Sequence, residues 1–253
     1  VEHSTPSKTS IPVVLCHGFP HTWFSWHRQL PALSNAGCKV LAPDMRGMGE
    51  TSVPKDISAY DVDTICRDLT GLLDYLEIDK AVFVGLDFGA FAIYDLALRF
   101  PERVIAVIGL ENPAAPHNPN KSPLAEYREM GADHFLHINY FCEKVGLADN
   151  DLLVRIDEFF PKVFWALSGE GNYFDTFKFP KETHYIDALN DPPSLPWNWL
   201  NIEEMQVFIA SYRKSGFTGG LNWYRSMDIK WEQRKPYENV SSNIPAYFFR
   251  KRK

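Results

Sequence analysis

The most informative segment of the chain reads Val82-Phe83-Val84-Gly85-Leu86-Asp87-Phe88-Gly89-Ala90. Its apolar, β-branched beginning predicts a buried strand over 81–85, and residues 89–99 are typical of a helix that stops before a proline. Glycines at 85 and 89 let such a strand and helix approach each other closely. We therefore expect the side chain of Asp87 to stand on a strained turn between them.

The same alternation of strand and helix extends on both sides of this turn. Further strands are expected at 11–16, 38–43 and 104–110, and further helices at 26–36, where Gly37 suits a C-cap, and from Val62 to Leu76. Alternating elements of this kind form right-handed crossovers on a parallel sheet. The sequence therefore predicts the α/β class.

The pattern changes after Glu111, where a loop rich in proline and asparagine begins. Amphipathic stretches at 151–160 and 203–213 predict helices, and strand character returns only at 244–249. We expect an N-terminal core part at 1–116, an inserted helical cap or lid at 117–231, and a return to the core at 232–253.

Composition limits the possible partners. Lys and Arg number 26 against 32 Asp and Glu, a net charge of −6, so the chain has no basic surplus for nucleic acid or for an anionic membrane. The first ten residues lack the features of a signal peptide, and widely spaced cysteines suit a reduced compartment, which predicts a cytoplasmic protein. We expect no cofactor, no metal, and a small-molecule substrate in an aromatic pocket.

Four segments together resemble the soluble epoxide hydrolases of the α/β-hydrolase superfamily. They are HGFP at 17–20, DMRGMGETSVP at 44–54, GLDFGA at 85–90 and GFTGGLNWYRSMDIKW at 216–231. The likeness extends from Ile11 to about Phe249. It implies a mostly parallel sheet flanked by helices, with an inserted helical lid, and hydrolysis of an epoxide substrate by water to a vicinal diol.

The resemblance assigns the nucleophile and its oxyanion hole. Asp87 occupies the nucleophile position of a G-x-D-x-G turn, and the backbone amides of Phe19 and Phe88 are the expected oxyanion donors. His17 and Pro20 are expected to brace the loop that carries Phe19, with a cis bond before Pro20 as one option. A carboxylate suits attack on an sp³ carbon, because it then forms an alkyl ester that water can cleave.

The leaving oxygen of an epoxide needs proton donors, which the family places in the lid. The matching tyrosine is Tyr224, and Trp223 beside it is expected to contribute to binding. The second family tyrosine stands four residues before a phenylalanine, where this sequence has His137 before Phe141. Either the register is shifted and Tyr140 donates, or the donor is His137, or a second donor is absent.

The family also requires a late acid and a C-terminal histidine that activates water. No histidine follows His184, and Glu111 is only a reserve candidate for the acid. We therefore expect a chain truncated at both ends, with an incomplete core sheet, impaired turnover, and exposed apolar surface that favours a homo-oligomer. Two alternatives remain open: a haloalkane-type dehalogenase, against which Phe88 beside the nucleophile argues, and a non-catalytic fragment that binds or traps substrate.

Overall fold

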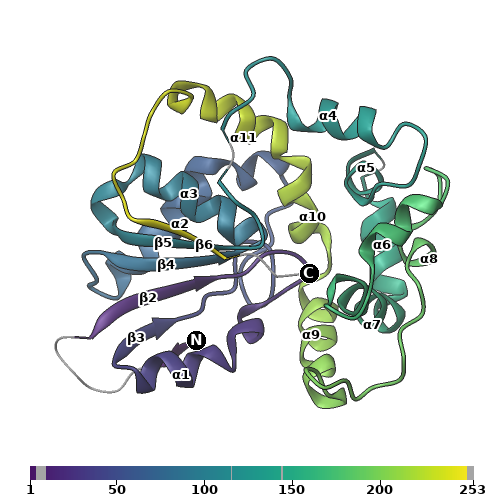
Figure 1. The fold of residues 1–253 in the computed structure, drawn as a ribbon, viewed down its shortest axis with the longest axis horizontal. Helices are drawn as coiled ribbons and strands as arrows, with labels where there is room; N and C mark the ends of the chain where they lie inside the picture. Colours follow the sequence, from purple (N-terminus) through teal and green to yellow (C-terminus); the bar gives the residue numbers. More distant parts are fainter. Residues whose placement is uncertain (4–9, 115, 144, 250–253) are drawn as a thin grey trace.

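The computed structural model describes residues 1–3, 10–114, 116–143 and 145–249 (Figure 1). Within these residues the strands form one sheet in the order β1-β3-β2-β4-β5-β6. The strands are β1 (Glu2–His3), β2 (Ile11–Cys16), β3 (Cys38–Leu41), β4 (Ala81–Leu86), β5 (Val104–Leu110) and β6 (Ala246–Phe249). β1 pairs antiparallel with β3, and every other neighbouring pair is parallel. The predicted α/β class is confirmed.

The described α-helices alternate with the strands as far as β5 and then follow one another. They are α1 (Gln29–Asn35), α2 (Val62–Tyr75), α3 (Phe88–Arg99), α4 (Pro123–Met130), α5 (His137–Glu143), α6 (Leu147–Val154), α7 (Ile156–Leu167), α8 (Tyr185–Ala188), α9 (Ile202–Ser215), α10 (Thr218–Arg225) and α11 (Met227–Arg234). Short 3₁₀ helices lie at Trp23–Trp26, Ile57–Tyr60, Pro101–Arg103, Tyr173–Lys178 and Lys235–Tyr237.

The core lies on both faces of the sheet because side chains alternate along each strand. On β2, Val13 and Leu15 pack with Trp26 and Leu30 on the α1 side. Val14 and Cys16 point the other way, into the larger cluster that includes residues of α2 and α3. Burying each large apolar side chain contributes about 1.5–3 kcal/mol to stability, so the alternation sets which face each strand residue occupies.

Several predicted elements need correction. The helix expected at 26–36 is a 3₁₀ turn at Trp23–Trp26 followed by α1, because apolar spacing does not separate a short 3₁₀ turn from an α-helix. The amphipathic stretch 151–160 is divided at Arg155, which ends α6 and precedes α7. The strands predicted at 38–43 and 244–249 are shorter, β3 and β6.

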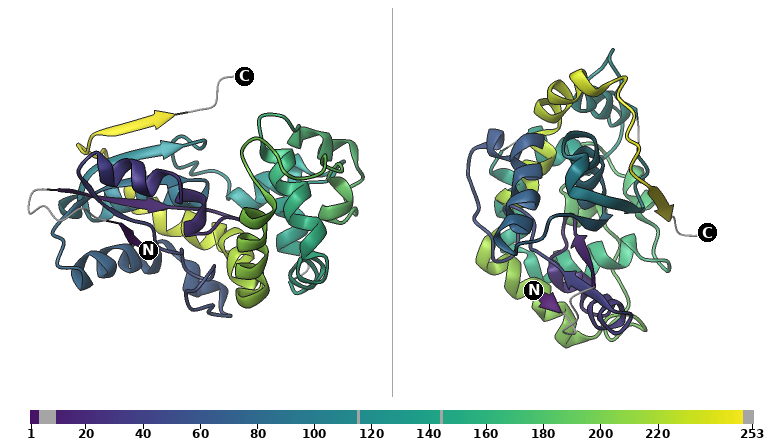
Figure 2. Two further views of the ribbon diagram at one scale, coloured as in Figure 1. Left: turned by 90° about the horizontal axis from the view of Figure 1, so that it is seen from below. Right: turned by 90° about the vertical axis from the view of Figure 1, so that its left-hand side faces the viewer.

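Helices α4 to α9, which we call the lid helices, lie beyond the carboxyl ends of the parallel strands (Figures 1 and 2). α10 and α11 lead back towards the core. α10 contacts the 3₁₀ helix at Ile57–Tyr60, and α11 contacts the lid helix α4. The arrangement leaves the turn after β4 facing the lid helices. The domain boundaries at 117 and 231 remain a prediction.

Candidate active site

Asp87 forms the turn between β4 and α3 in a conformation that few non-glycine residues adopt. Its backbone has φ +54° and ψ −122°, which costs about 1–3 kcal/mol and needs support from the surrounding structure. That support comes from close packing: a Cβ on Gly89 would collide with the carbonyl of Cys16 on β2, and one on Gly85 would collide with the carbonyl of Gly89. The strained strand-to-helix turn expected from the sequence is therefore present.

Two backbone amides converge on the carboxylate of Asp87. The amide of Phe19 donates a hydrogen bond of 2.8 Å to Oδ1, and the amide of Phe88 also donates to this carboxylate. Gly18 allows the approach, because a Cβ there would overlap Oδ1 of Asp87. The bond between Phe19 and Pro20 is cis. The structure thus brings together the three groups that the sequence pointed to.

The surroundings of Asp87 favour its neutral form. Burial raises the pKa of the Asp87 carboxyl to about 7, although the two amide hydrogen bonds act in the opposite direction. The negative charge of Glu111 raises this pKa further, and the positive charge of Lys230 lowers it. Near neutral pH both the acid and the carboxylate are therefore populated, and only the carboxylate is a nucleophile.

His17 braces the loop that carries the Phe19 amide. Its Nδ1 lies 2.8 Å from the carbonyl of Gly18, and its Nε2 accepts a hydrogen bond of 2.9 Å from the amide of Met45. Because Nε2 accepts, the proton of the neutral ring sits on Nδ1. Burial lowers the pKa of His17, so the ring stays neutral. It links the loop at Gly18 to the loop at Met45 through these two contacts.

Tyr224 stands across from Asp87 on α10. Its ring meets that of Phe88 edge-on at 4.6 Å between centroids and that of Phe19 at 5.8 Å. Burial raises the pKa of its phenol well above 10, and the negative charge of Asp87 raises it further. Within the described residues its hydroxyl forms no hydrogen bond, so the O–H is available to a ligand.

The structure separates the two candidates for the second donor. The hydroxyl of Tyr140 donates to Asp151 at 2.8 Å and lies 3.5 Å from Nδ1 of His184, so it is engaged within the lid helices. The ring of His137, in contrast, meets that of Tyr224 at 5.7 Å. Its Nε2 forms no hydrogen bond with a described residue. His137, not Tyr140, therefore shares a site with Tyr224.

Two tyrosines lie beside His137. The hydroxyl of Tyr173 lies 2.5 Å from Nδ1 of His137 and also interacts with the hydroxyl of Tyr185. Burial lowers the pKa of His137 to about 4, so the ring is neutral. In the tautomer in which Tyr173 donates to Nδ1, the ring carries its proton on Nε2. Sequence reasoning missed both tyrosines, because nothing in their spacing connects them with position 137.

Trp223 lies behind the site and does not offer its N–H to a ligand. Its indole N–H donates 2.9 Å to the carbonyl of Arg46, and its ring packs on Phe88 at 5.4 Å between centroids. The expected contribution to binding is therefore indirect, through the position of Phe88.

An open groove of about 1130 Å³ lies at the carboxyl ends of the strands, between the sheet and the lid helices. Leu86 and Leu110 line it from the sheet, and Phe164 and Trp199 line it from the other side. Glu111, the reserve acid, is exposed on its wall. The described residues contain no cluster of three or more His, Cys, Asp or Glu side chains that could hold a metal ion, and none of their helices is long and apolar enough to cross a membrane.

The sheet order, the strained turn and the paired amides define an α/β hydrolase, and a family model described as the alpha/beta hydrolase fold matches residues 11–137. The chain is 37% identical to Epoxide hydrolase A of Mycobacterium tuberculosis (strain ATCC 25618 / H37Rv) over 93% of this chain and 73% of that protein. The crystal structure of Epoxide Hydrolase A from Mycobacterium thermoresistibile superposes on this chain with a TM-score of 0.91 and 38% sequence identity. The match covers 98% of this chain and 77% of that one.

A longer relative, Bifunctional epoxide hydrolase 2 of Sus scrofa, is 37% identical over 87% of this chain, which spans 39% of that protein's length. The chain belongs to the epoxide hydrolase family, and it is a hydrolase by this membership. The resemblance on which the sequence-based assignment of Asp87 depends is confirmed at the level of the family.

Proposed function

We propose that the protein opens epoxides to vicinal diols through an alkyl ester on Asp87. One carboxylate oxygen attacks a ring carbon in line, the C–O bond on the opposite side breaks, and the leaving oxygen takes a proton from the enzyme. The observation that carries this proposal is the arrangement around Asp87. Its carboxylate is held by two amides, and its charge acts on the phenol of Tyr224, whose O–H has no hydrogen-bond partner among the described residues. The ring of His137 meets that of Tyr224.

Tyr224 and His137 are the proposed donors to the epoxide oxygen. Both are neutral at pH 7. The phenol carries its proton, and the ring of His137 presents an N–H at Nε2 when Nδ1 accepts from Tyr173. A positioned acid of this kind contributes about 10²–10⁴ to the rate. Tyr140 is not included, since its hydroxyl is held by Asp151.

Cleavage of the ester needs a base that activates water, and Asp87 forms no hydrogen bond to a histidine within the described part of the chain. We infer that the ester forms faster than it is hydrolysed, so that the chain is impaired in turnover and traps substrate as an adduct.

The geometry of the site does not favour the dehalogenase alternative. A leaving halide needs an indole or guanidinium N–H beside the nucleophile, whereas Phe88 has none and the N–H of Trp223 is bound to a carbonyl. A binding protein without chemistry would not need the strained backbone of Asp87.

A burst experiment tests the proposal. We mix the protein with excess styrene oxide and follow epoxide loss and diol formation. The expected result is rapid loss of one equivalent of epoxide per protein, followed by slow diol release. Dehalogenation of a chloroalkane by the same sample, with no epoxide consumed, would replace this proposal with the dehalogenase. No consumption of either would support the binding protein.

A further inference from the structure

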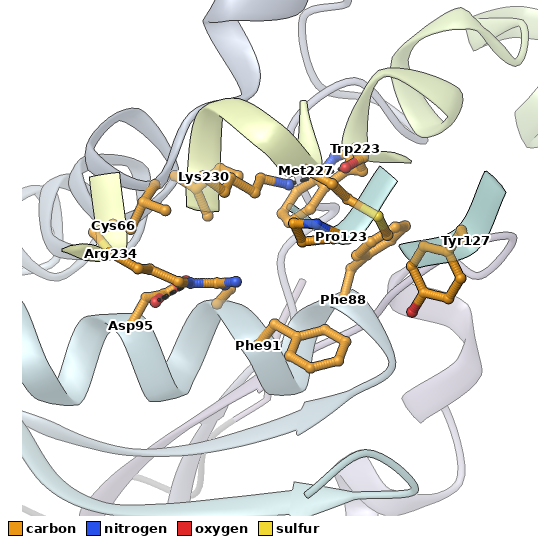
Figure 3. Close-up of a pocket in the computed structure, with 13 residues that line it drawn as sticks. Cys66, Phe88, Phe91, Asp95, Pro123, Tyr127, Trp223, Met227, Lys230 and Arg234 are labelled. Atoms are coloured by element: carbon orange, nitrogen blue, oxygen red, sulfur yellow. Dashed lines mark hydrogen bonds and ion pairs between the residues drawn. The ribbon is translucent and has the colours of Figure 1, made fainter. Parts of the chain in front are cut away.

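A second cavity, of about 150 Å³, lies between the core helices α2 and α3 and the helices α4, α10 and α11 (Figure 3). Most of its wall is apolar, and aromatic rings come from α3, α4 and α10. The lining residues on which the argument depends are Cys66, Phe88, Phe91, Trp223, Lys230 and Arg234. The mechanism proposed for Asp87 uses none of the charged side chains in this cavity.

Lys230 of α11 places an ammonium group in this wall without a counter-ion. The residue is 6% exposed, and its Nζ donates 3.1 Å to the carbonyl of Trp223. The same atom lies 4.5 Å from the ring centroid of Trp223 and 5.4 Å from that of Phe88. Among the described residues Lys230 forms no ion pair.

Arg234, one turn further along α11, is in a different situation. Its guanidinium makes two hydrogen bonds of 2.8 and 2.6 Å to the carboxylate of Asp95 on α3, so its charge is compensated within the protein. Figure 3 shows this pair at one end of the cavity and the Lys230 amine at the other side. The cavity therefore contains one cation that the protein neutralises and one that it does not.

The charged groups that act on Lys230 come from several elements. Arg234 disfavours its protonated form, and the carboxylates of Asp95, Asp61 and Asp87 favour it. Burial outweighs them and lowers the pKa of Lys230 to about 7. The other titratable groups of the wall, Cys66 and Tyr127, have pKa values raised by burial and stay neutral.

We propose that this cavity is a binding site for a small aromatic monocarboxylate, with its carboxylate on the Lys230 ammonium. A buried charge is stable only when it is paired, and one uncompensated cation calls for a monoanion. A cavity of about 150 Å³ in another protein holds one benzene ring, so the ligand has one ring. The ligand ring can make edge and face contacts with the aromatic side chains of Phe88, Phe91 and Trp223.

The site couples ligand binding to proton binding. The bound carboxylate stabilises the ammonium, so above pH 7 each ligand brings about one proton with it, and its affinity falls about tenfold for each further pH unit. A neutral ligand of the same shape gains nothing from Lys230 and takes up no proton. Binding is independent of ester formation on Asp87, so this proposal and the proposed function can fail separately.

Isothermal titration with benzoate at pH 8, in buffers of different ionisation enthalpy, measures both binding and proton uptake. The Asp87→Asn variant serves as the background, because the Asp87 carboxyl also titrates near pH 7. We expect uptake of about 0.9 proton per benzoate bound and at least tenfold weaker binding of benzamide. Lys235→Met, at an exposed lysine that directly follows α11, is the matched control and should bind benzoate unchanged.

Two variants at Lys230 complete the experiment. Lys230→Met should weaken benzoate binding at least tenfold at pH 6, where the wild-type amine is protonated. Lys230→Arg keeps a charge that does not titrate, so it should bind benzoate without proton uptake even if the Met variant does not fold. Absence of benzoate binding at pH 6, equal affinity for benzamide, or proton uptake that persists in Lys230→Arg would each overturn the proposal.

Discussion

The backbone amide of Phe19 donates a 2.8 Å hydrogen bond to Oδ1 of Asp87, a residue 68 positions later in the chain. The amide that would hold the oxyanion during ester cleavage thus already binds the nucleophile in the resting protein. The oxygen it holds is set to become the carbonyl oxygen of the ester, which leaves the other oxygen for attack. In the proposed mechanism, the nucleophile and the oxyanion hole are therefore one preorganised unit.

Adduct formation should depend on pH chiefly through Asp87, which must be ionised to attack. Because the pKa of its carboxyl is raised to about 7, about a tenth of the protein holds the reactive carboxylate at pH 6, and almost all of it at pH 8. The rate of ester formation should rise about tenfold over this range and then level off. His137 and Tyr224 do not titrate there, with pKa values lowered to about 4 and raised well above 10. Stopped-flow epoxide loss gives the profile, and a flat one from pH 5 to 8 would contradict it.

The two donors should differ clearly from Tyr140. Tyr224→Phe should slow ester formation about 10²–10⁴-fold, since the phenol protonates the leaving oxygen. His137→Phe should slow it about 10–100-fold, the value of a hydrogen bond to a developing charge. Tyr140→Phe, the matched control, should change the rate less than about twofold. A large decrease in rate for Tyr140→Phe with little change for His137→Phe would support Tyr140 as the second donor.

Tyr173 should act through His137 as a positioning residue. In Tyr173→Phe nothing donates to Nδ1, so the neutral ring divides between its two tautomers and fewer molecules carry the proton on Nε2. Ester formation should slow by up to about tenfold, and ¹⁵N chemical shifts of His137 should move away from those of the Nε2–H tautomer. Unchanged shifts in this variant would show that Tyr173 only packs against the ring.

The glycine after the nucleophile should be essential for stability. A methyl group at Gly89 collides with the backbone of Cys16, which cannot move without breaking the pairing of β2 and β4, so Gly89→Ala should cost at least about 1–3 kcal/mol of unfolding free energy. Gly71→Ala is the control: it lies within α2 with open space around it and should stabilise by up to about 1 kcal/mol. Urea unfolding measures both, and equal stabilities would disprove close packing at the turn.

The parts of the fold predicted best are those with strong periodicity. The buried strands 11–16 and 104–110 have their predicted bounds, because unbroken apolar runs between turn signals leave little choice. β1 was not predicted, since two residues carry no period and depend on pairing with β3. The division of 151–160 at Arg155 was missed because amphipathic spacing continues across the break.

The sequence predicted the positions of those candidate site residues that directly follow strands, whereas their catalytic roles stay a prediction. The turn at Asp87 and the loop at Phe19 follow strands directly, so their convergence could be expected from the sheet alone. Which side chain points towards Tyr224 depends on the orientation of each lid helix about its own axis. The sequence pattern alone therefore does not distinguish His137 from Tyr140. No role was predicted for Lys230, which lies in the segment 216–231, because its position against Trp223 and Phe88 depends on the packing of helices.

Mass spectrometry of the protein after reaction with styrene oxide tests the central claim most directly. The account predicts one adduct per chain, with the mass of one epoxide, located on the peptide that contains Asp87 and absent from Asp87→Asn. The adduct should release diol when the ester is cleaved at alkaline pH. An unmodified Asp87 in folded protein that has consumed epoxide, or an adduct that persists in Asp87→Asn, would contradict the assignment of Asp87 as the nucleophile.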